Sequence, residues 1–211
     1  MNKEKIESTF LDVRKAYRLL FHYQKRVLNL VDFISKEFGF DYKGGYPIHM
    51  DSSPNKGRGE LCNSPWNWLN MYAYEFRMKS QKFGRRTVDL SIYLQSDSGA
   101  PFKTNHDMDE LDKYDSLDKS KTRLHFLLTD KALKEEDYNL IIDDGDIPHD
   151  KDCSKFLEHN GGKLFIKAFN LSEFINEEKS INILLEIAKE FKSKTDIELK
   201  ILKNRVDDQN N

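Results

Sequence analysis

The residues best suited to chemistry in this chain are two carboxylates, Glu75 and Asp89, which lie in two neighbouring stretches of alternating apolar residues. If a hairpin turns around Lys82, the two carboxylates face each other across its strands. Directly opposed carboxylates repel, so a divalent cation or a nearby arginine such as Arg77 must offset the repulsion. The pair therefore predicts either a Mg²⁺ or Mn²⁺ site or a salt-bridged pair, and a different register of the hairpin would separate the two residues.

An acidic segment further along the chain could supply more ligands to such a site. Hard divalent cations prefer oxygen ligands, and a metal-dependent phosphodiesterase or nuclease would use them to activate water. However, the Asp-then-Glu-x-Lys order of many such nucleases is absent, because Glu75 and Arg77 precede Asp89 here. The enzyme is therefore the alternative hypothesis. The additional candidate ligands are Asp143, Asp144 and Asp146.

Other familiar sites are missing from the sequence. It contains no HExxH, CxxC or GxSxG motif, which disfavours common metalloprotease, thiol-redox and serine-hydrolase chemistry. Cys62 and Cys153 are isolated, so we expect reduced thiols in a cytoplasmic protein. No apolar run is long enough to span a membrane, and the N-terminus has no apolar signal core, so we expect no membrane partner.

Charge is unevenly distributed along the 211 residues, although the net charge is only −2. Residues 1–105 carry 17 Lys and Arg against 11 Asp and Glu, whereas residues 106–211 carry 17 against 25. A basic first half permits a contact with nucleic acid, but its excess of positive charge is too small for a dedicated nucleic-acid-binding protein. Attraction between the two halves of the fold is the simpler interpretation.

The N-terminal segment, Lys3 to about Phe40, predicts a very long amphipathic helix. Its apolar residues alternate in steps of four and three, which is the heptad pattern of a helix that packs one face on partner helices. We expect this row to be buried along its length, so that Leu20→Ala costs roughly 2–5 kcal/mol. The helix either bends into two or projects to bind something. The row comprises Ile6, Phe10, Val13, Tyr17, Leu20, Val27, Val31, Ile34 and Phe38, with Gln24 as its one polar member.

Basic and aromatic residues give a candidate binding surface. Four residues on the predicted helix recur every fourth position, which places them on one stripe beside the apolar row. Further candidates come from a loop over residues 40–62 and from the turn and hairpin that follow. Within this loop, we expect residues 43–59 to be mobile until a partner orders them. A solvated helix face and a filled core explain the same residues more simply. The candidates are Arg14, Arg18, His22, Arg26, Lys56, Arg58, Trp66, Trp68, Lys82, Arg85 and Arg86.

The remaining pattern predicts an α+β fold. A hairpin around residues 72–94 and strands near residues 123–128, 163–169 and 197–201 suggest a mainly antiparallel sheet of four to five strands. Helical spacing over residues 180–191 predicts a C-terminal helix that packs with the long helix on this sheet. We expect one domain over residues 1–202 and a disordered tail over 203–211.

These observations favour a cytoplasmic interaction or regulatory protein without catalytic activity. Its partner would be another protein, or a second copy bound along the N-terminal helix. The first alternative is the metal-dependent phosphodiesterase or nuclease, with Mg²⁺ or Mn²⁺ on the carboxylates. The second is nucleic-acid binding without catalysis through the basic helix stripe.

Overall fold

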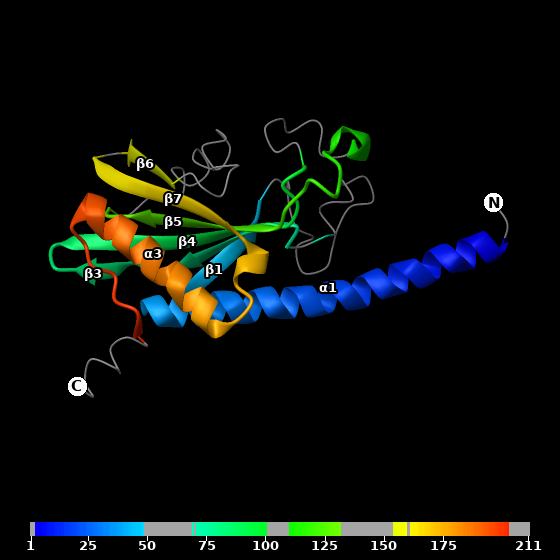
Figure 1. Ribbon diagram of the computed structural model, residues 1–211, viewed down its shortest axis with the longest axis horizontal. Coiled ribbons are helices and arrows are strands. Elements are labelled where there is room, and N and C mark those ends of the chain that lie inside the picture. Colours follow the sequence, from blue (N-terminus) through cyan, green and yellow to red (C-terminus); the bar gives the residue numbers. More distant parts are fainter. Residues whose placement is uncertain are drawn as a thin grey trace.

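The computed structural model describes residues 3–48, 69, 71–100, 110–131, 154–159 and 161–202 of the chain. In these parts a long helix, an antiparallel sheet and a C-terminal helix confirm the predicted α+β class (Figure 1). The sheet has seven strands rather than the four to five expected. The predictions for residues 132–153 and for the tail from residue 203 onward lie outside the described residues.

The N-terminal helix α1 is continuous over Lys3–Phe38, 36 residues, and does not bend into two helices. It ends at Gly39, whose φ of 74° places it in the left-handed region that glycine tolerates best. The amide of Gly39 donates to the Lys36 carbonyl, and the amide of Phe40 donates to the Ser35 carbonyl. This paired arrangement is a Schellman motif, which satisfies carbonyls at the end of a helix.

Six strands form the main path of the sheet, in the order β1-β2-β4-β5-β7-β6, and β3 pairs with β4 beside it. All pairings are antiparallel. The short β3 strand and β4 are joined at Gly84, which has a φ of 63°. The strands are β1 (Tyr42–Pro47), β2 (Ala73–Met78), β3 (Gln81–Phe83), β4 (Arg86–Gln95), β5 (Arg123–Thr129), β6 (Ser154–His159) and β7 (Gly162–Asn170).

The first edge strand corrects the prediction of a loop over residues 40–62 at residues 42–47. Residues 49–62, which hold most of the segment predicted to be mobile, lie outside the described residues. Tyr42–Pro47 forms β1 on β2, and Gly45 pairs with Phe76. A Cβ atom added at Gly45 would lie 2.6 Å from the carbonyl oxygen of Glu75, so only glycine allows this close approach. The two glycines of this segment favour a loop when only the sequence is considered, whereas one of them fits a tight strand pairing.

We expect Gly45→Ala to lower the free energy of unfolding by about 1–3 kcal/mol, because the added methyl group must push β1 away from β2. Lys43→Ala is the control on the same strand, since the Lys43 side chain is exposed. Chemical denaturation of both variants measures the difference. Equal midpoints would show that β1 is not held at this distance.

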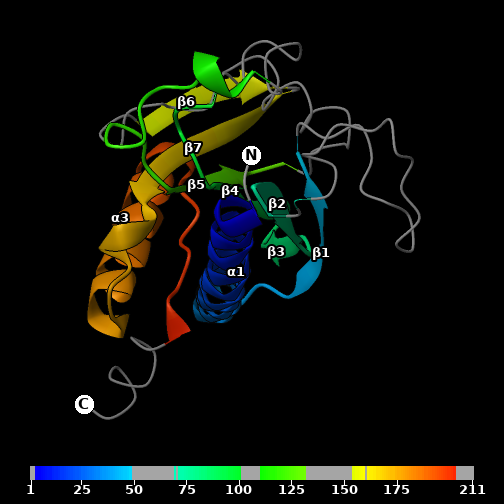
Figure 2. The ribbon, with the colours of Figure 1, turned by 90° about the vertical axis from the view of Figure 1, so that its right-hand side faces the viewer.

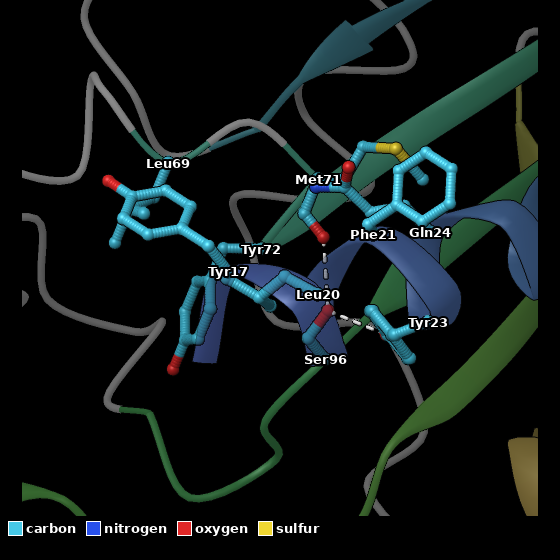
Figure 3. Close-up of a pocket in the computed structure, with 9 residues that line it drawn as sticks. All are labelled: Tyr17, Leu20, Phe21, Tyr23, Gln24, Leu69, Met71, Tyr72 and Ser96. Atoms are coloured by element: carbon cyan, nitrogen blue, oxygen red, sulfur yellow. Dashed lines mark hydrogen bonds between the residues drawn. The ribbon is translucent and has the colours of Figure 1, made fainter. Parts of the chain in front are cut away.

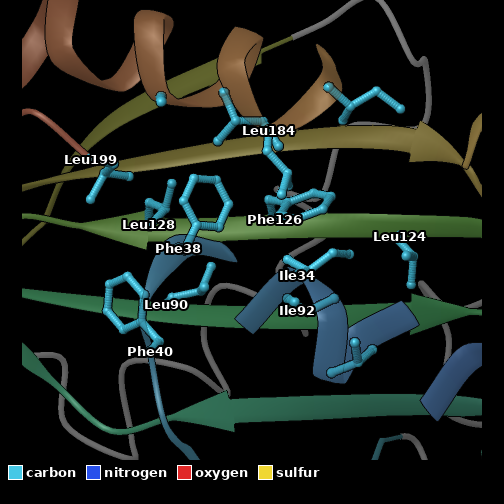
Figure 4. Close-up of a cluster of buried hydrophobic side chains, with 14 of the residues drawn as sticks. Ile34, Phe38, Phe40, Leu90, Ile92, Leu124, Phe126, Leu128, Leu184 and Leu199 are labelled. Carbon is cyan, nitrogen blue, oxygen red and sulfur yellow. The ribbon is translucent and has the colours of Figure 1, made fainter. Parts of the chain in front are cut away.

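Both helices cover the same face of the sheet (Figures 1 and 2). The C-terminal helix α3, Glu177–Thr195, begins at Asn176, whose side chain accepts a bond from the Lys179 amide. Two short 3-10 turns, η2 (Leu111–Lys113) and η3 (Leu171–Glu173), lie in the connections. The main core lies between this sheet face and the helices, and includes Ile34, Phe38, Leu90, Phe126 and Leu184 (Figure 4).

The segment after α3 was predicted as a closing strand, and this prediction is wrong. Residues 196–201 have no strand pairing in the structure and run between the two helices (Figure 2). Ile197, Leu199 and Ile201 are nevertheless buried in the main core. The alternation of apolar residues therefore indicates an extended segment with one buried side, and this segment does not pair with a strand of the sheet.

Candidate functional site

The apolar row on α1 divides into a buried half and an exposed half. Val27, Val31, Ile34 and Phe38 pack on the sheet and are at most 4% exposed. All ten residues from Leu11 to Leu20 are exposed. The expectation that the row is buried along its length is therefore wrong for the N-terminal half, because α1 runs past the end of the sheet (Figure 1).

We call the projecting part of this row the free seam: Ile6, Phe10, Val13, Tyr17 and Leu20, of which all but the half-buried Ile6 are exposed. Phe10 is 52% exposed and Tyr17 is 66% exposed, although both are large apolar side chains. Leu19 and Phe21 beside the seam are 71% and 63% exposed. A monomer seldom leaves so many neighbouring apolar side chains in water unless they contact a partner.

The free seam ends at a pocket where α1 meets the rest of the protein (Figure 3). Its volume is about 390 Å³. Tyr17 and Leu20 line it from the helix, and Leu69 and Tyr72 line it from the other side. The apolar row therefore leads from the projecting helix directly into a cavity with a largely apolar and aromatic lining. The other lining residues are Phe21, Tyr23, Gln24, Met71 and Ser96.

Two hydrogen-bond contacts fix α1 at this point. The Ser96 hydroxyl donates to the Met71 carbonyl at 3.0 Å, so it accepts from the Tyr23 hydroxyl, which lies 2.9 Å away. Burial raises the pKa of Tyr23, so its phenol keeps the proton that it donates. Arg26 Nη2 donates to the Phe174 carbonyl at 3.3 Å. The helix is thus held from about Tyr23 onward and projects before it.

The basic candidates do not form one surface. Arg14, Arg18 and His22 are exposed on the projecting part of α1. Gln81 on β3 donates to the carbonyl of Gly39, at the opposite end of the same helix. The four stripe residues, Arg26 included, lie between 13 and 25 residues before Gly39, which is roughly 20–38 Å along the helix. The candidates at the β3–β4 turn are Lys82, Arg85 and Arg86.

The two carboxylates also lie apart, and the predicted register is wrong. Glu75 pairs with Tyr93, and Asp89 pairs with Thr129 on the next strand. The hairpin turns at Gly84 rather than Lys82, so Glu75 and Asp89 are offset by four residues along the strands, roughly 13 Å. The arrangement that motivated a shared Mg²⁺ or Mn²⁺ ion is therefore not formed.

Glu75 instead has protein partners for both of its carboxylate oxygens. Arg77 Nε donates to Oε2 at 2.7 Å, and the Ser91 hydroxyl donates to Oε1 at 2.6 Å. The guanidinium of Arg77 also lies 4.8 Å from the centre of the Tyr46 ring. Glu75 is 1% exposed, so this ion pair is buried on the sheet face opposite the helices.

Several predicted site residues lie outside the described part of the chain. Within the described residues, no group of three or more His, Cys, Asp and Glu side chains is close enough to hold a metal ion. No helix in the same residues has a stretch long and apolar enough to cross a membrane. The predicted residues outside the description are Lys56, Arg58, Cys62, Trp66, Trp68, Asp143, Asp144, Asp146 and Cys153.

Comparison with known proteins places almost the whole fold in one family. The model of the family PM0109 matches residues 3–198, from the first described residue of α1 to beyond α3. The chain belongs to the PM0109 family. The match includes the projecting half of α1, so the family model covers the long helix over its whole length.

One curated relative is the "Uncharacterized protein PM0109" of Pasteurella multocida (strain Pm70). It is 44% identical to this chain over 52 residues, which is 25% of this chain and 26% of the relative. The similarity to this relative therefore spans about a quarter of each protein. No solved structure matches the chain.

Proposed function

We propose that this member of the PM0109 family is a cytoplasmic interaction protein without catalytic activity, and that the projecting half of α1 is its docking surface. The observation that supports this proposal is the continuity of one heptad row from the core into solvent. Val27 is 0% exposed, and Val13, two heptads earlier on the same row, is 44% exposed. A row that packs on a sheet at one end has the residues to pack on a partner at the other.

The energetics favour a partner for this surface. Burying a large apolar side chain that is otherwise in water stabilises a complex by roughly 1.5–3 kcal/mol before the cost of association. The free seam offers four exposed positions of this kind, and Leu19 and Phe21 widen it. Because this part of α1 is already helical in the structure, a partner would bind it without first ordering a helix.

The seam variant Val13→Asp tests this proposal. We expect it to keep the fold, because Val13 lies outside the core, and to lose association, because a carboxylate in a packed seam is desolvated without a partner. Ser8→Asp is the matched control, since it adds the same charge to the solvated side of the same exposed helix segment.

Size-exclusion chromatography of the tagged chain in extract of its own cells measures the effect. The original protein and Ser8→Asp should elute above the 24.9 kDa of a single chain, and Val13→Asp should elute as a single chain. An original protein that elutes as a single chain in extract would contradict the proposal. Equal elution of all three variants above that mass would place the interface elsewhere on the molecule.

A further inference from the structure

The free seam can accept only a short helix, because the sheet limits it at one end. Its first apolar residue is Ile6. It ends at the pocket beside Leu20 and Gln24, beyond which Val27 and Val31 are covered by the sheet. A helix laid on the seam must therefore stop opposite about Leu20.

A second copy of α1 meets this condition in one orientation. In a parallel pair, the two helices would run side by side past Leu20. From Val27 onward, each helix would carry its own sheet on the side that faces the other helix. Two sheets would then compete for the space between the helices. In an antiparallel pair centred on the seam, Ile6 of the second helix lies opposite Tyr17 of the first, and the two sheets lie at opposite ends of the pair.

An antiparallel pair also aligns the heptad positions. Phe10 and Tyr17 occupy the a positions of the row, and Ile6 and Val13 occupy the d positions. Antiparallel helices pack a against d, so Phe10 would lie against Val13 of the second copy and Ile6 against Tyr17. The twofold symmetry repeats both contacts, which gives four apolar layers from two identical surfaces.

Charge favours the same orientation. Residues 3–12 of α1 carry Lys3 and Lys5 against Glu4, Glu7 and Asp12, whereas residues 14–26 carry five basic residues and no acidic one. A parallel pair would align the two basic segments with each other. In the antiparallel register, the e position Glu7 lies near the e position Arg14 of the second copy, and symmetry repeats this pair. The basic residues of the second segment are Arg14, Lys15, Arg18, Lys25 and Arg26.

We propose that the free seam binds a second copy of this chain as an antiparallel helix pair, with Glu7 of each copy beside Arg14 of the other. This inference rests on the proposed docking function of α1 and names its partner. Eight seam side chains would bury on the order of 1,000 Å², an area typical of weak complexes. We therefore expect a reversible dimer, whose population rises with the concentration of the protein.

Charge reversal tests the pairing. Sedimentation of the purified full chain over roughly 1 to 300 μM covers micromolar dissociation constants. Glu7→Arg and Arg14→Glu should each raise the dimer dissociation constant about three- to tenfold, and the double variant should restore it. Val13→Asp should raise it about 100-fold or more. If the double variant dimerises no better than either single variant, the Glu7–Arg14 contact is contradicted.

Distances between spin labels test the orientation. Labels are placed at Lys3→Cys or Asp12→Cys in a Cys62→Ser, Cys153→Ser background. In the antiparallel register the two Lys3 sites lie about 17 helical residues apart, roughly 26 Å along the axis, and the two Asp12 sites lie nearly level. A parallel dimer would give similar short distances at both sites, and would overturn the proposal.

The outcomes also separate this inference from the function on which it rests. A purified chain that stays monomeric throughout the concentration range would overturn self-association. If the original protein in extract still elutes above the mass of one chain, and Val13→Asp does not, α1 docks a different protein and only the identity of its partner is wrong. If neither association is seen, both proposals fail.

Discussion

Ile34→Ala is expected to lower the free energy of unfolding by roughly 2–5 kcal/mol, whereas Leu20→Ala on the same heptad row is expected to cost less than about 1 kcal/mol. Ile34 is 0% exposed and packs between α1 and the sheet, so its truncation leaves a cavity in the main core. Leu20 is 39% exposed and lies at the surface, so its truncation leaves no enclosed cavity in the core.

Urea denaturation of both variants, at a concentration low enough to keep the chain monomeric, measures this contrast. Gln24→Ala is a third point on the row, expected to resemble Leu20→Ala, because Gln24 lies between the exposed and buried halves. A loss for Leu20→Ala as large as that for Ile34→Ala would mean that the N-terminal half of α1 is packed in the monomer. The docking surface proposed on α1 would then not exist.

Glu75→Ala is expected to lower the free energy of unfolding by roughly 3–5 kcal/mol, because it removes one partner of a buried ion pair. Arg77, whose side chain is 13% exposed, would keep its charge without the carboxylate that it contacts at 2.7 Å. Ser91 would lose the acceptor of its hydroxyl. Glu75→Gln should cost less, since the amide oxygen can still accept one bond.

Substitution of Glu75 also distinguishes the two hypotheses, an interaction protein and a metal-dependent enzyme. If Arg77 and Ser91 satisfy Glu75, then added Mg²⁺ or Mn²⁺ should leave the melting temperature unchanged, because no folded-state metal site is created at Glu75. Asp118→Asn is a control for the loss of one carboxylate, since Asp118 is exposed. A rise in melting temperature with Mn²⁺ that Glu75→Gln abolishes would favour the phosphodiesterase or nuclease.

The helices and the fold class could be predicted because the periodicity of an amphipathic helix is a local property of the sequence. The strands were predicted less well. Residues 42–47 read as a loop, yet Gly45 is needed for close pairing of β1 with β2. The hairpin was predicted, but with the wrong register, because its turn falls at Gly84 rather than at Lys82. The strand that leads to this turn is also interrupted between β2 and β3. A register depends on the turn as well as on the alternation of side chains.

The division of α1 into a buried and an exposed half could not be predicted from periodicity. Val13 and Val27 occupy the same heptad position on one row, and only the extent of the sheet decides which of them is covered. The length of the helix was the useful signal: 36 residues span roughly 54 Å, more than a domain of this size needs to cover its sheet. An ion pair of Glu75 with Arg77 was predicted as one way to offset the repulsion between the carboxylates. The hydrogen bond from Ser91 to Glu75 could not be predicted, because it depends on the register of β2 against β4.

Site-specific photo-crosslinking in the protein's own cells tests the central claim most directly. A photoreactive phenylalanine analogue replaces Tyr17 on the free seam or Lys15 on the solvated side of the same helix; both residues are exposed. We expect a discrete crosslinked product from position 17 that Val13→Asp abolishes, and none from position 15. Crosslinking from position 15 but not from position 17, or from neither, would contradict the claim that the free seam is a docking surface.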